Sequence, residues 1–522
     1  MFELALALGI YSYSIFLLGL LGLLYKSTVI IFTILFVFIV IFAKRKSFGT
    51  FSLPKLDRFT KFLFFILALQ AFINLIGVLG PELSFDALWY HLTLPKIYLE
   101  NHAIFHIRGS LLYYSDIPKN IEMIYVAALS FGNEILAKFA HYMFGILTLL
   151  ILYKTSRIFI ERKYALISLL IFYANLVVGW QSIAAYVDLG TTFFTTVSLY
   201  AFLLWLSKKN HKYLIFSAII SGLTVATKLV SLNLMVIYVI LIIVAGLAGK
   251  EKYSKVLKNI ISFGIISAVV ASPWPIFAFV NTGNPFYPLF EPQFGIYYKN
   301  TILDIFKLFL FSQDPVNPLY AISIPLIVIY FFKFDFRMKV VTVFCMLSIL
   351  LWYFDSEIGG SRFILPYLPA FSLLVSYAIS FINKNQLKKY FLAIVILIAL
   401  SSIGYRFLAN YKYLPVILGR ESKAEFLSAH LNFSFGDFYD TNGYFKNNIR
   451  PTDRVLLYGF HNLYYVDFPY IDSTWAKKGD PFDYIAVQNV NLPMRFSNWK
   501  LVYYNRLTNV KLYSNGGKVW YY

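Results

Sequence analysis

Residues 81–131 read PELSFDALWYHLTLPKIYLENHAIFHIRGSLLYYSDIPKNIEMIYVAALSF, and the interpretation of the whole chain starts from this stretch. It is the first place where acids, histidines and an arginine collect between long apolar segments. Asp86 lies about six residues beyond the apolar run 62–80. If that run spans a bilayer, the carboxylate of Asp86 lies at or just outside one membrane face. It is then either an interfacial anchor or a group that takes part in chemistry.

The composition assigns the chain to a class. Of its 522 residues, 59% are apolar and only 14% are charged, whereas about a quarter of a soluble domain is charged. Apolar runs of about 17–25 residues are long enough to cross roughly 30 Å of hydrocarbon as helices. The sequence therefore predicts an all-α polytopic membrane protein. About thirteen such runs are present, at residues 5–25, 28–43, 62–80, 133–153, 164–181, 188–207, 213–227, 229–247, 259–280, 316–332, 340–354, 364–382 and 390–408.

The net charge of +20 is explained by membrane topology and does not indicate a nucleic-acid partner. The basic residues cluster in alternate short loops, which all fall on one side of the membrane if the thirteen helices are correct. The N-terminus is therefore expected in the cytoplasm and the C-terminal segment outside. The first apolar run lacks a preceding basic segment, so we interpret it as a retained helix. The basic loops are 44–61, 154–163, 208–212, 250–258, 333–339 and 384–389.

Two domains are expected. Residues 1–410 form a multi-helix membrane domain with a first large outer loop at 81–132. Residues 411–522 are richer in charge and in Asn, Asp and Gly, and this predicts a small extracytoplasmic α/β domain. We expect its helix at 423–430, its strands at 454–459, 484–490, 501–504 and 510–513, and a closing turn at the NGG sequence 515–517.

Three more ionisable residues lie at the predicted outer ends of helices. Asp188 begins the run 188–207, where it either faces outward or caps the helix. Lys228 lies between two runs too close for an exposed loop, which indicates a functional residue, with snorkelling to the head groups as the alternative. Arg362 follows Glu357 and a Gly-Gly pair in an outward loop. Its guanidinium is suited to gripping a phosphate, although an interfacial arginine fits this loop equally well.

The other polar candidates carry weaker signals. His91, His102 and His106 share the first outer loop but lack an HExxH pattern, so we interpret them as polar interfacial residues and not as metal ligands. The single cysteine lies in an apolar run, so an intrachain disulfide is excluded. The Pro- and Gly-rich segment 272–290, which includes Asn284, predicts a shaped loop. We expect this loop and the Arg362 loop to share one outward cavity.

The order of these pieces resembles the GT-C membrane glycosyltransferases. The chain is similar to the branch that holds the protein O-mannosyltransferases, the aminoarabinose transferase of lipid A and the RgtA/B/C/D-like enzymes. The resemblance covers residues 60–410. Many relatives have Asp-Glu at the first site, whereas here Ala87 follows Asp86, which leaves Glu82 as the nearby second acid. The matching stretches are SFDALWYHLTLPKIYL, DIPKNIEMIY, YVDLGTTFF, GLTVATK, SPWPIFAFVNTGNPFYP and SRFILPYLPAFSLL.

The resemblance implies inverting transfer of a sugar from a polyprenyl-phosphate donor to a lipid, glycan or protein acceptor at the outer membrane face. Asp86 would be the general base and Asp188 would orient the acceptor or assist the base. Lys228 and Arg362 would stabilise the departing phosphate. No cofactor is certain, although a divalent cation could lie between the two carboxylates. The other site candidates are Glu82, His91, Glu122, Asn284 and Glu357.

Three other functions remain open at this point. A transporter or lipid flippase would place ionisable residues near the bilayer midplane and often has repeated halves, whereas the candidates here lie at one face. A ligase or polymerase of lipid-linked glycans is usually expected to carry its large outer loop late in the chain, whereas here it is early. The Ala at position 87 is also compatible with a non-catalytic lipid-binding scaffold. The expected partners are the lipid-linked donor, the acceptor and membrane lipids, and no nucleic acid.

Overall fold

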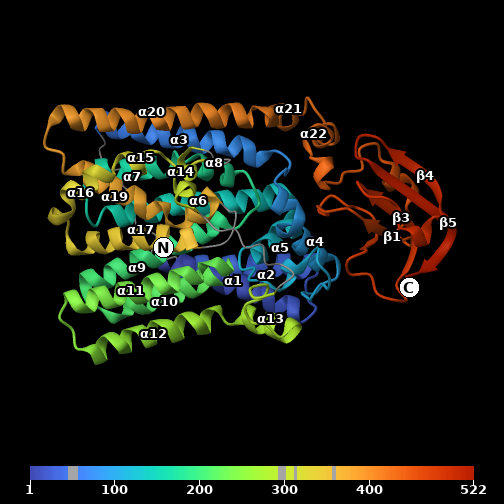
Figure 1. The fold of residues 1–522 in the computed structure, drawn as a ribbon, viewed down its shortest axis with the longest axis horizontal. Helices are drawn as coiled ribbons and strands as arrows, with labels where there is room; N and C mark the ends of the chain where they lie inside the picture. Colours follow the sequence, from blue (N-terminus) through green and yellow to red (C-terminus); the bar gives the residue numbers. More distant parts are fainter. Residues whose placement is uncertain (45–56, 292–300, 311–313, 355–359, 522) are drawn as a thin grey trace.

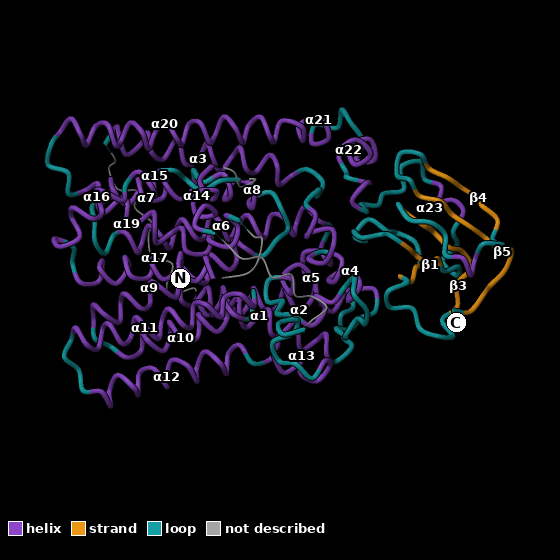
Figure 2. Tube along the Cα trace, viewed as in Figure 1, coloured by secondary structure: helices purple, strands orange, loops and turns teal. Residues whose placement is uncertain are grey.

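The computed structural model describes residues 1–44, 57–291, 301–310, 314–354 and 360–521. It consists of a bundle of long helices with a small sheet domain at one end (Figure 1). All described strands belong to that end domain, and the bundle is built from helices and their connections (Figure 2). The predicted fold class, a helical membrane protein with a small C-terminal α/β domain, is confirmed.

Ten described helical segments are long and apolar enough to cross a membrane, or eleven if one bent pair counts as a span. The chain is therefore a multi-pass membrane protein. The ten segments are α1 (Phe2–Leu20), α2 (Lys26–Lys44), α3 (Arg58–Leu79), α6 (Glu134–Ser156), α9 (Asp188–Lys208), η4 with α11 (Leu229–Ser231 and Leu232–Ala248), α12 (Tyr253–Ala271), α17 (Phe336–Phe354), α18 with η7 and α19 (Ser361–Ile364, Leu365–Tyr367 and Leu368–Ser380), and α20 with η8 and α21 (Asn385–Asn410, Tyr411–Tyr413 and Leu414–Ile417).

By this measure the prediction of about thirteen membrane helices is too high, because three of the predicted runs do not form one long helix. The run 164–181 is divided into α7 (Arg162–Tyr173) and α8 (Leu176–Ser182), which are bent by 70°. The predicted run 213–227 forms α10 (His211–Val225), which has 15 residues. At 1.5 Å per residue this helix is about 22 Å long, which is short of the roughly 30 Å hydrocarbon core.

The third of these runs, 316–332, is divided into short pieces. They are α15 (Leu319–Ile322), α16 (Ile324–Tyr330) and η6 (Phe331–Lys333). Pro325 lies at the start of α16. Proline has no N–H to donate to the preceding turn, so a continuous helix through this point is disfavoured.

The first large loop is folded and mostly buried. It contains the π-helix η2 (Ala87–His91), α4 (Thr93–Glu100), η3 (Tyr113–Asp116) and α5 (Glu122–Phe131). Helices α4 and α5 lie at the end of the bundle that faces the sheet domain (Figure 1). The segment expected to be a shaped loop is helical as α13 (Pro273–Thr282) and then turns at Gly283, whose positive φ of 77° favours glycine. Helix α14 (Ile302–Leu310) follows.

The C-terminal domain has a five-stranded sheet in the order β2-β1-β3-β5-β4. Strand β1 pairs in parallel with β2 and β3, whereas β5 pairs antiparallel with β3 and β4. The predicted helix 423–430 is α22 (Lys423–His430), and a second short helix is α23 (Tyr444–Asn448). The strands are β1 (Val455–Tyr458), β2 (Tyr470–Asp472), β3 (Pro481–Gln488), β4 (Lys500–Asn505) and β5 (Val510–Trp520).

Two details of this domain differ from the prediction. Strand β2 was not expected, because three residues are too few for a period-2 pattern to stand out. The NGG sequence 515–517 lies within β5 and forms no closing turn. Opposite it the register shifts between Phe482 and Tyr484, which is the signature of a β-bulge, where glycine is common.

The basic connections lie away from the sheet domain wherever Figure 1 shows them clearly. The connections α11–α12 and α19–α20 are at the end of the bundle opposite the sheet domain. Two of the predicted basic loops, 250–258 and 384–389, lie in these connections and in the first turns of α12 and α20. Most of the first basic loop, at 45–56, lies outside the described residues.

Candidate active site

Four charged residues that are far apart in the sequence meet in one cluster. The Nη1 atom of Arg362 lies 2.5 Å from Oδ2 of Asp86, and its Nε lies 3.0 Å from Oδ2 of Asp188. The Nζ atom of Lys228 lies 2.7 Å from Oδ1 of Asp188. These residues, Asp86, Asp188, Lys228 and Arg362, are called the charged cluster below.

Each member of the charged cluster lies at the end of a helix. Asp86 directly precedes the π-helix η2, and such single π-turns are frequent at functional sites. Asp188 is the first residue of α9, but its carboxylate binds the two cations and no side-chain cap is formed at that helix end. Lys228 directly precedes η4, and Arg362 lies in α18. Helix ends place these charges where the apolar bundle stops.

The two carboxylates of the charged cluster differ in exposure. The side chain of Asp86 is 19% exposed, whereas that of Asp188 is 0% exposed. Lys228 and Arg362 are 17% and 14% exposed. An incoming molecule can therefore reach one carboxylate and both cations, while Asp188 lies behind them and satisfies their charge.

Asp86 is held in its ionised form. Burial acts to raise its pKa, but the nearby Arg362 and His91, together with the hydrogen bond from Arg362, hold the pKa below its usual value of 3.8. The hydroxyl of Tyr90 also donates to Oδ2 of Asp86 at 3.3 Å. The hydroxyl of Tyr186 accepts the backbone N–H of Asp86 at 3.3 Å, and the Tyr186 ring lies 4.4 Å from the Arg362 guanidinium. At neutral pH Asp86 is therefore a fixed carboxylate.

Glu82 is a structural anchor and does not form a second acid beside Asp86. Its Oε1 accepts the backbone N–H groups of Leu83 and Ser84 at 2.9 and 2.8 Å, and its Oε2 accepts that of Ala185 at 2.6 Å. The buried carboxylate thus joins the segment before Asp86 to the connection that leads into α9. Both carboxylate oxygens of Glu82 are used by backbone N–H groups, so Glu82 does not supply the second acid that is missing at position 87.

Lys138 supports the same segment and was not identified from the sequence. Its buried ammonium donates to the carbonyl oxygens of Gly77 and Gly80 at 2.8 Å and to that of Pro81 at 3.2 Å. These carbonyls end α3 and lead toward Asp86, so Lys138 on α6 acts as a C-terminal cap. The signal was available, because an ionisable residue inside a predicted membrane run indicates a specific role.

His91 and Glu122 pair with each other behind the charged cluster. Nδ1 of His91 lies 2.8 Å from Oε1 of Glu122, and both side chains are buried. Burial lowers the pKa of His91, although Glu122 opposes the shift. Nearby, burial lowers the pKa of Lys119 to about 8, and its Nζ has no hydrogen-bond partner among the described residues. Glu122 is therefore committed to His91 and lies outside the hydrogen-bond network of Asp86.

The other sequence candidates lie elsewhere or cannot be placed. Among the described residues, the side chain of Asn284 bonds to Phe286, Leu289 and Glu291, so it organises its own turn. Glu357 lies outside the described residues. His106 pairs with Asp116 at 2.7 Å, and Asp116 also accepts the Asn281 amide at 3.0 Å. The first loop is thereby joined to the end of α13.

A divalent cation between the two carboxylates does not fit this arrangement. The guanidinium of Arg362 occupies the position between Asp86 and Asp188. Within the described part of the chain, no group of three or more His, Cys, Asp or Glu side chains could hold a metal ion. The charges of the carboxylates are balanced by protein cations.

The C-terminal domain contacts the residues on both sides of Asp86. The ring of His461 lies 4.7 Å from that of Phe85 and 4.4 Å from that of Trp89. The hydroxyl of Tyr465 donates to the carbonyl oxygen of Glu82 at 3.0 Å. Segment 461–467 of the small domain is therefore part of the wall that positions Asp86.

Comparisons with known proteins agree with this architecture. The dolichyl-phosphate-mannose-protein mannosyltransferase family matches residues 109–287, a range that includes Asp188 and Lys228. The structure of ArnT from Cupriavidus metallidurans bound to undecaprenyl phosphate has a TM-score of 0.59 at 12% identity, and the match covers 87% of this chain and 98% of ArnT. The apo structure of ArnT has a TM-score of 0.60 with the same identity and coverage.

A second neighbour is the oligosaccharyltransferase of Archaeoglobus fulgidus in complex with Zn and sulfate. It has a TM-score of 0.50 at 14% identity, and the match covers 86% of this chain and 73% of that enzyme. A search of curated protein sequences finds no match. The family match over residues 109–287 and the shared fold confirm the resemblance to the GT-C membrane glycosyltransferases that was found in the sequence.

Proposed function

We propose that this chain transfers a sugar, with inversion, from a polyprenyl-phosphate donor to a lipid, glycan or protein acceptor at the outer face of the membrane. The observation that carries this proposal is the charged cluster, in which one accessible carboxylate lies beside two accessible cations. The structural neighbour ArnT was determined with undecaprenyl phosphate, which supports a lipid phosphate as the leaving group.

In the proposed reaction, the acceptor oxygen attacks the anomeric carbon of the donor sugar. The proton of the acceptor hydroxyl passes to the carboxylate of Asp86, which acts as general base. The bond between the anomeric carbon and the phosphate oxygen breaks, and its electron pair remains on the phosphate. Arg362 and Lys228 stabilise the negative charge that develops on the phosphate. This stabilisation is largest when both cations are held in place before the reaction. Asp188 is the positioning residue that fixes both cations.

Donor binding also weakens the ion pair between Arg362 and Asp86, the proposed base. A phosphate that approaches Arg362 competes with Asp86 for the same guanidinium. Once the phosphate takes up part of that charge, the Asp86 carboxylate is less stabilised and becomes a stronger base. The ion pair thus holds the carboxylate in place and ionised before the substrates arrive.

The topology supports the same reaction. In the proposed orientation the N-terminus and the basic loops face the cytoplasm, and the first large loop and residues 411–522 face outside. The charged cluster then lies near the outer interface, where the phosphate of a polyprenyl lipid resides. The acceptor approaches between the first loop and the C-terminal domain.

Binding of undecaprenyl phosphate to the purified protein tests the assignment of the cations. Lys228→Met and Arg362→Met should each weaken binding by about tenfold or more, because each removes a charge-assisted contact. Lys228→Arg and Arg362→Lys keep the charge near Asp188 and serve as variants that fold. Lys154→Met, on the exposed side of α6, is the matched control. Undiminished binding in the two methionine variants, with the fold intact, would exclude these cations from the phosphate site.

A further inference from the structure

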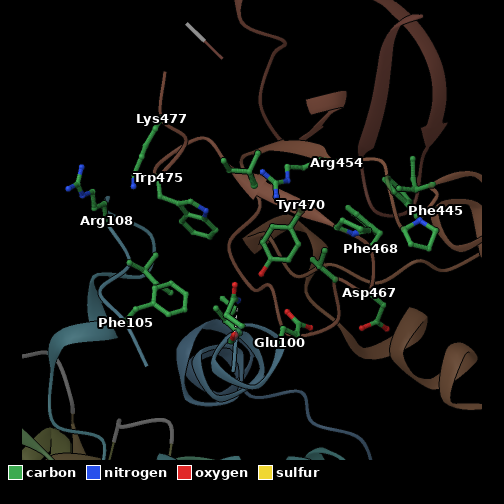
Figure 3. Close-up of a pocket in the computed structure, with 18 of the residues that line it drawn as sticks. Glu100, Phe105, Arg108, Phe445, Arg454, Asp467, Phe468, Tyr470, Trp475 and Lys477 are labelled. Atoms are coloured by element: carbon green, nitrogen blue, oxygen red, sulfur yellow. Dashed lines mark hydrogen bonds between the residues drawn. The ribbon is translucent and has the colours of Figure 1, made fainter. Parts of the chain in front are cut away.

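A cavity separate from the charged cluster lies between the first loop and the C-terminal domain. It is called the cationic cavity below. Its volume is about 910 Å³, near the upper end of the roughly 300–1,000 Å³ of small-molecule sites. One wall comes from residues 97–108 and the other from the C-terminal domain, including β2 and the segment after it. Figure 3 shows Phe105 and Arg108 on the first wall, across from Tyr470 and Trp475.

The two walls are held together by specific contacts. Lys96 donates to the carbonyl oxygens of Tyr464 and Val466 at 2.9 and 2.6 Å and to the carboxylate of Asp467 at 3.0 Å. Gly109 has a φ of 89°, and a Cβ at this position would collide with the carbonyl group of Thr474. The loop and the domain therefore touch at both ends of the cavity, which makes it a built feature of the fold.

The charges that line this cavity are unbalanced. Four exposed basic side chains line it, and within the described chain none of them forms an ion pair or a side-chain hydrogen bond. The two acidic residues of the lining, Glu100 and Asp467, already lie 4.0 and 3.0 Å from the ammonium of Lys96. The cavity therefore presents uncompensated positive charge and would concentrate anions. The four basic residues are Arg108, Lys446, Arg454 and Lys477.

Aromatic rings supply the rest of the lining. Figure 3 shows Trp475 next to Lys477 and Arg108, and Tyr470 beside Arg454, while Phe105 lies below Arg108. Partly exposed rings of this kind pack against the C–H faces of sugar rings, because the electron-rich ring face attracts weakly positive hydrogens. Cations next to aromatic faces suit a ligand that has both sugar rings and negative charges.

We propose that this cavity binds an anionic saccharide, one that carries carboxylate or phosphate groups. Its role as the docking site of the acceptor rests on the proposed function, whereas the binding itself does not. The saccharide would lie with its rings against Trp475 and Tyr470 and its acidic groups against Arg108, Arg454 and Lys477. An acidic peptide would satisfy the charges but would leave the aromatic faces unused.

The test measures binding of three labelled probes of equal length to the full-length protein in nanodiscs, without donor. Hexagalacturonate is an anionic saccharide, maltohexaose is a neutral saccharide and hexaglutamate is an acidic peptide. Hexagalacturonate should bind at least about tenfold more tightly than either of the others, since each added charge-assisted contact is worth about that factor. Its affinity should fall as salt is added.

Two double variants locate the site. Arg454→Gln with Lys477→Gln should weaken hexagalacturonate binding by about tenfold or more. Lys500→Gln with Lys518→Gln removes the same charge from exposed parts of β4 and β5 outside the cavity and should leave binding unchanged. Trp475→Ala should weaken hexagalacturonate and maltohexaose binding alike. Equal affinity for the three probes, tighter binding of hexaglutamate, or equal effects of the two double variants would overturn the proposal.

The result can be separated from the proposed reaction. Asp86→Asn lies outside the cavity and should bind hexagalacturonate as the parent does. If this variant keeps full transfer activity, Asp86 is not the base and the proposed mechanism fails, while the cavity assignment stands. If the parent protein itself transfers no sugar, the proposed function fails and the cavity assignment still stands. If the three probes bind with equal affinity while Asp86→Asn still abolishes transfer, only the cavity assignment fails.

Discussion

Arg362 connects the two carboxylates of the site, which are separated by 102 positions in the sequence. It bonds to Asp86, which is accessible, and to Asp188, which is fully buried. Because Asp188 also binds Lys228, its charge is used within the protein. In the proposed mechanism the buried carboxylate of Asp188 therefore positions the two cations, and the accessible carboxylate of Asp86 meets the substrate.

The pairing with Arg362 predicts the pH dependence of the reaction. The pKa of Asp86 is held below its usual 3.8, so the carboxylate stays ionised until the pH falls through that lowered value. The ratio kcat/KM reports the pKa of the free enzyme. We therefore expect kcat/KM to be flat between about pH 5 and 8, with no acidic limb in that window. An acidic limb centred near pH 6 would show that a different group acts as the base.

At the residue scale, the sequence indicated which residues matter but not how they pair. Asp86, Asp188, Lys228 and Arg362 were singled out because charges are costly at the ends of apolar helices. Their mutual contacts depend on which helix ends adjoin, and residue spacing carries no information about that. The contacts of Glu82 could not be predicted for the same reason, because its partners are the backbone N–H groups of residues 83, 84 and 185.

At the scale of elements, the segment that carries Asp86 is held from both ends. Lys138 caps the carbonyls at the end of α3, and His461 and Tyr465 of the C-terminal domain pack on the residues around Asp86. The π-helix η2 then turns the chain into α4. This support explains how a segment between a membrane helix and a loop can hold a fixed carboxylate.

The cap on α3 predicts a stability effect. Lys138→Met keeps much of the side-chain volume but leaves three buried carbonyl oxygens without their donor. We expect the free energy of unfolding to fall by about 1–3 kcal/mol, the cost of unsatisfied buried polar groups. Thermal unfolding in detergent measures it. Lys154→Met on the same helix, where the side chain is exposed, should behave as the parent does, and equal effects of the two variants would contradict the capping role.

The elements also show where sequence patterns fail. The run 164–181 is continuous in hydropathy, yet it bends by 70° between α7 and α8. Hydropathy indicates that a segment is buried in lipid or protein, but it does not show where a helix within that segment is broken. The helix 423–430 was predicted with its observed bounds, and the structure shows a capping box at its start, formed by Ser422 and Glu425.

At the scale of the whole molecule, the C-terminal domain lies at one end of the bundle, and at least two basic connections lie at the other (Figure 1). The first loop and the C-terminal domain join the charged cluster to the cationic cavity through shared segments, 82–108 and 461–477. In the proposed orientation both sites face outside. A lipid donor would enter from the bilayer and an acceptor from the aqueous side.

The orientation is tested by cysteine labelling. The one native cysteine, Cys345, is buried, so the background is low. Cysteines placed at Asn101 and Asn442 should react with an impermeant thiol reagent in intact cells whose outer barrier is permeable. A cysteine at Lys250, in a basic connection, should react only after lysis. The reverse pattern would invert the proposed topology and place the charged cluster at the wrong face.

The role of Asp86 as general base is the central claim, and replacing it by asparagine tests that claim most directly. The readout is the rate at which the sugar lost from the cell envelope on gene deletion is restored, followed by mass spectrometry at equal protein levels. Asp86→Asn keeps the shape and removes the charge, so it should bind undecaprenyl phosphate yet restore the sugar about 10²–10⁴-fold more slowly than the parent. Asp57→Asn, at the far end of α3, should restore it at the parental rate. Restoration by Asp86→Asn at the parental rate would contradict the mechanism.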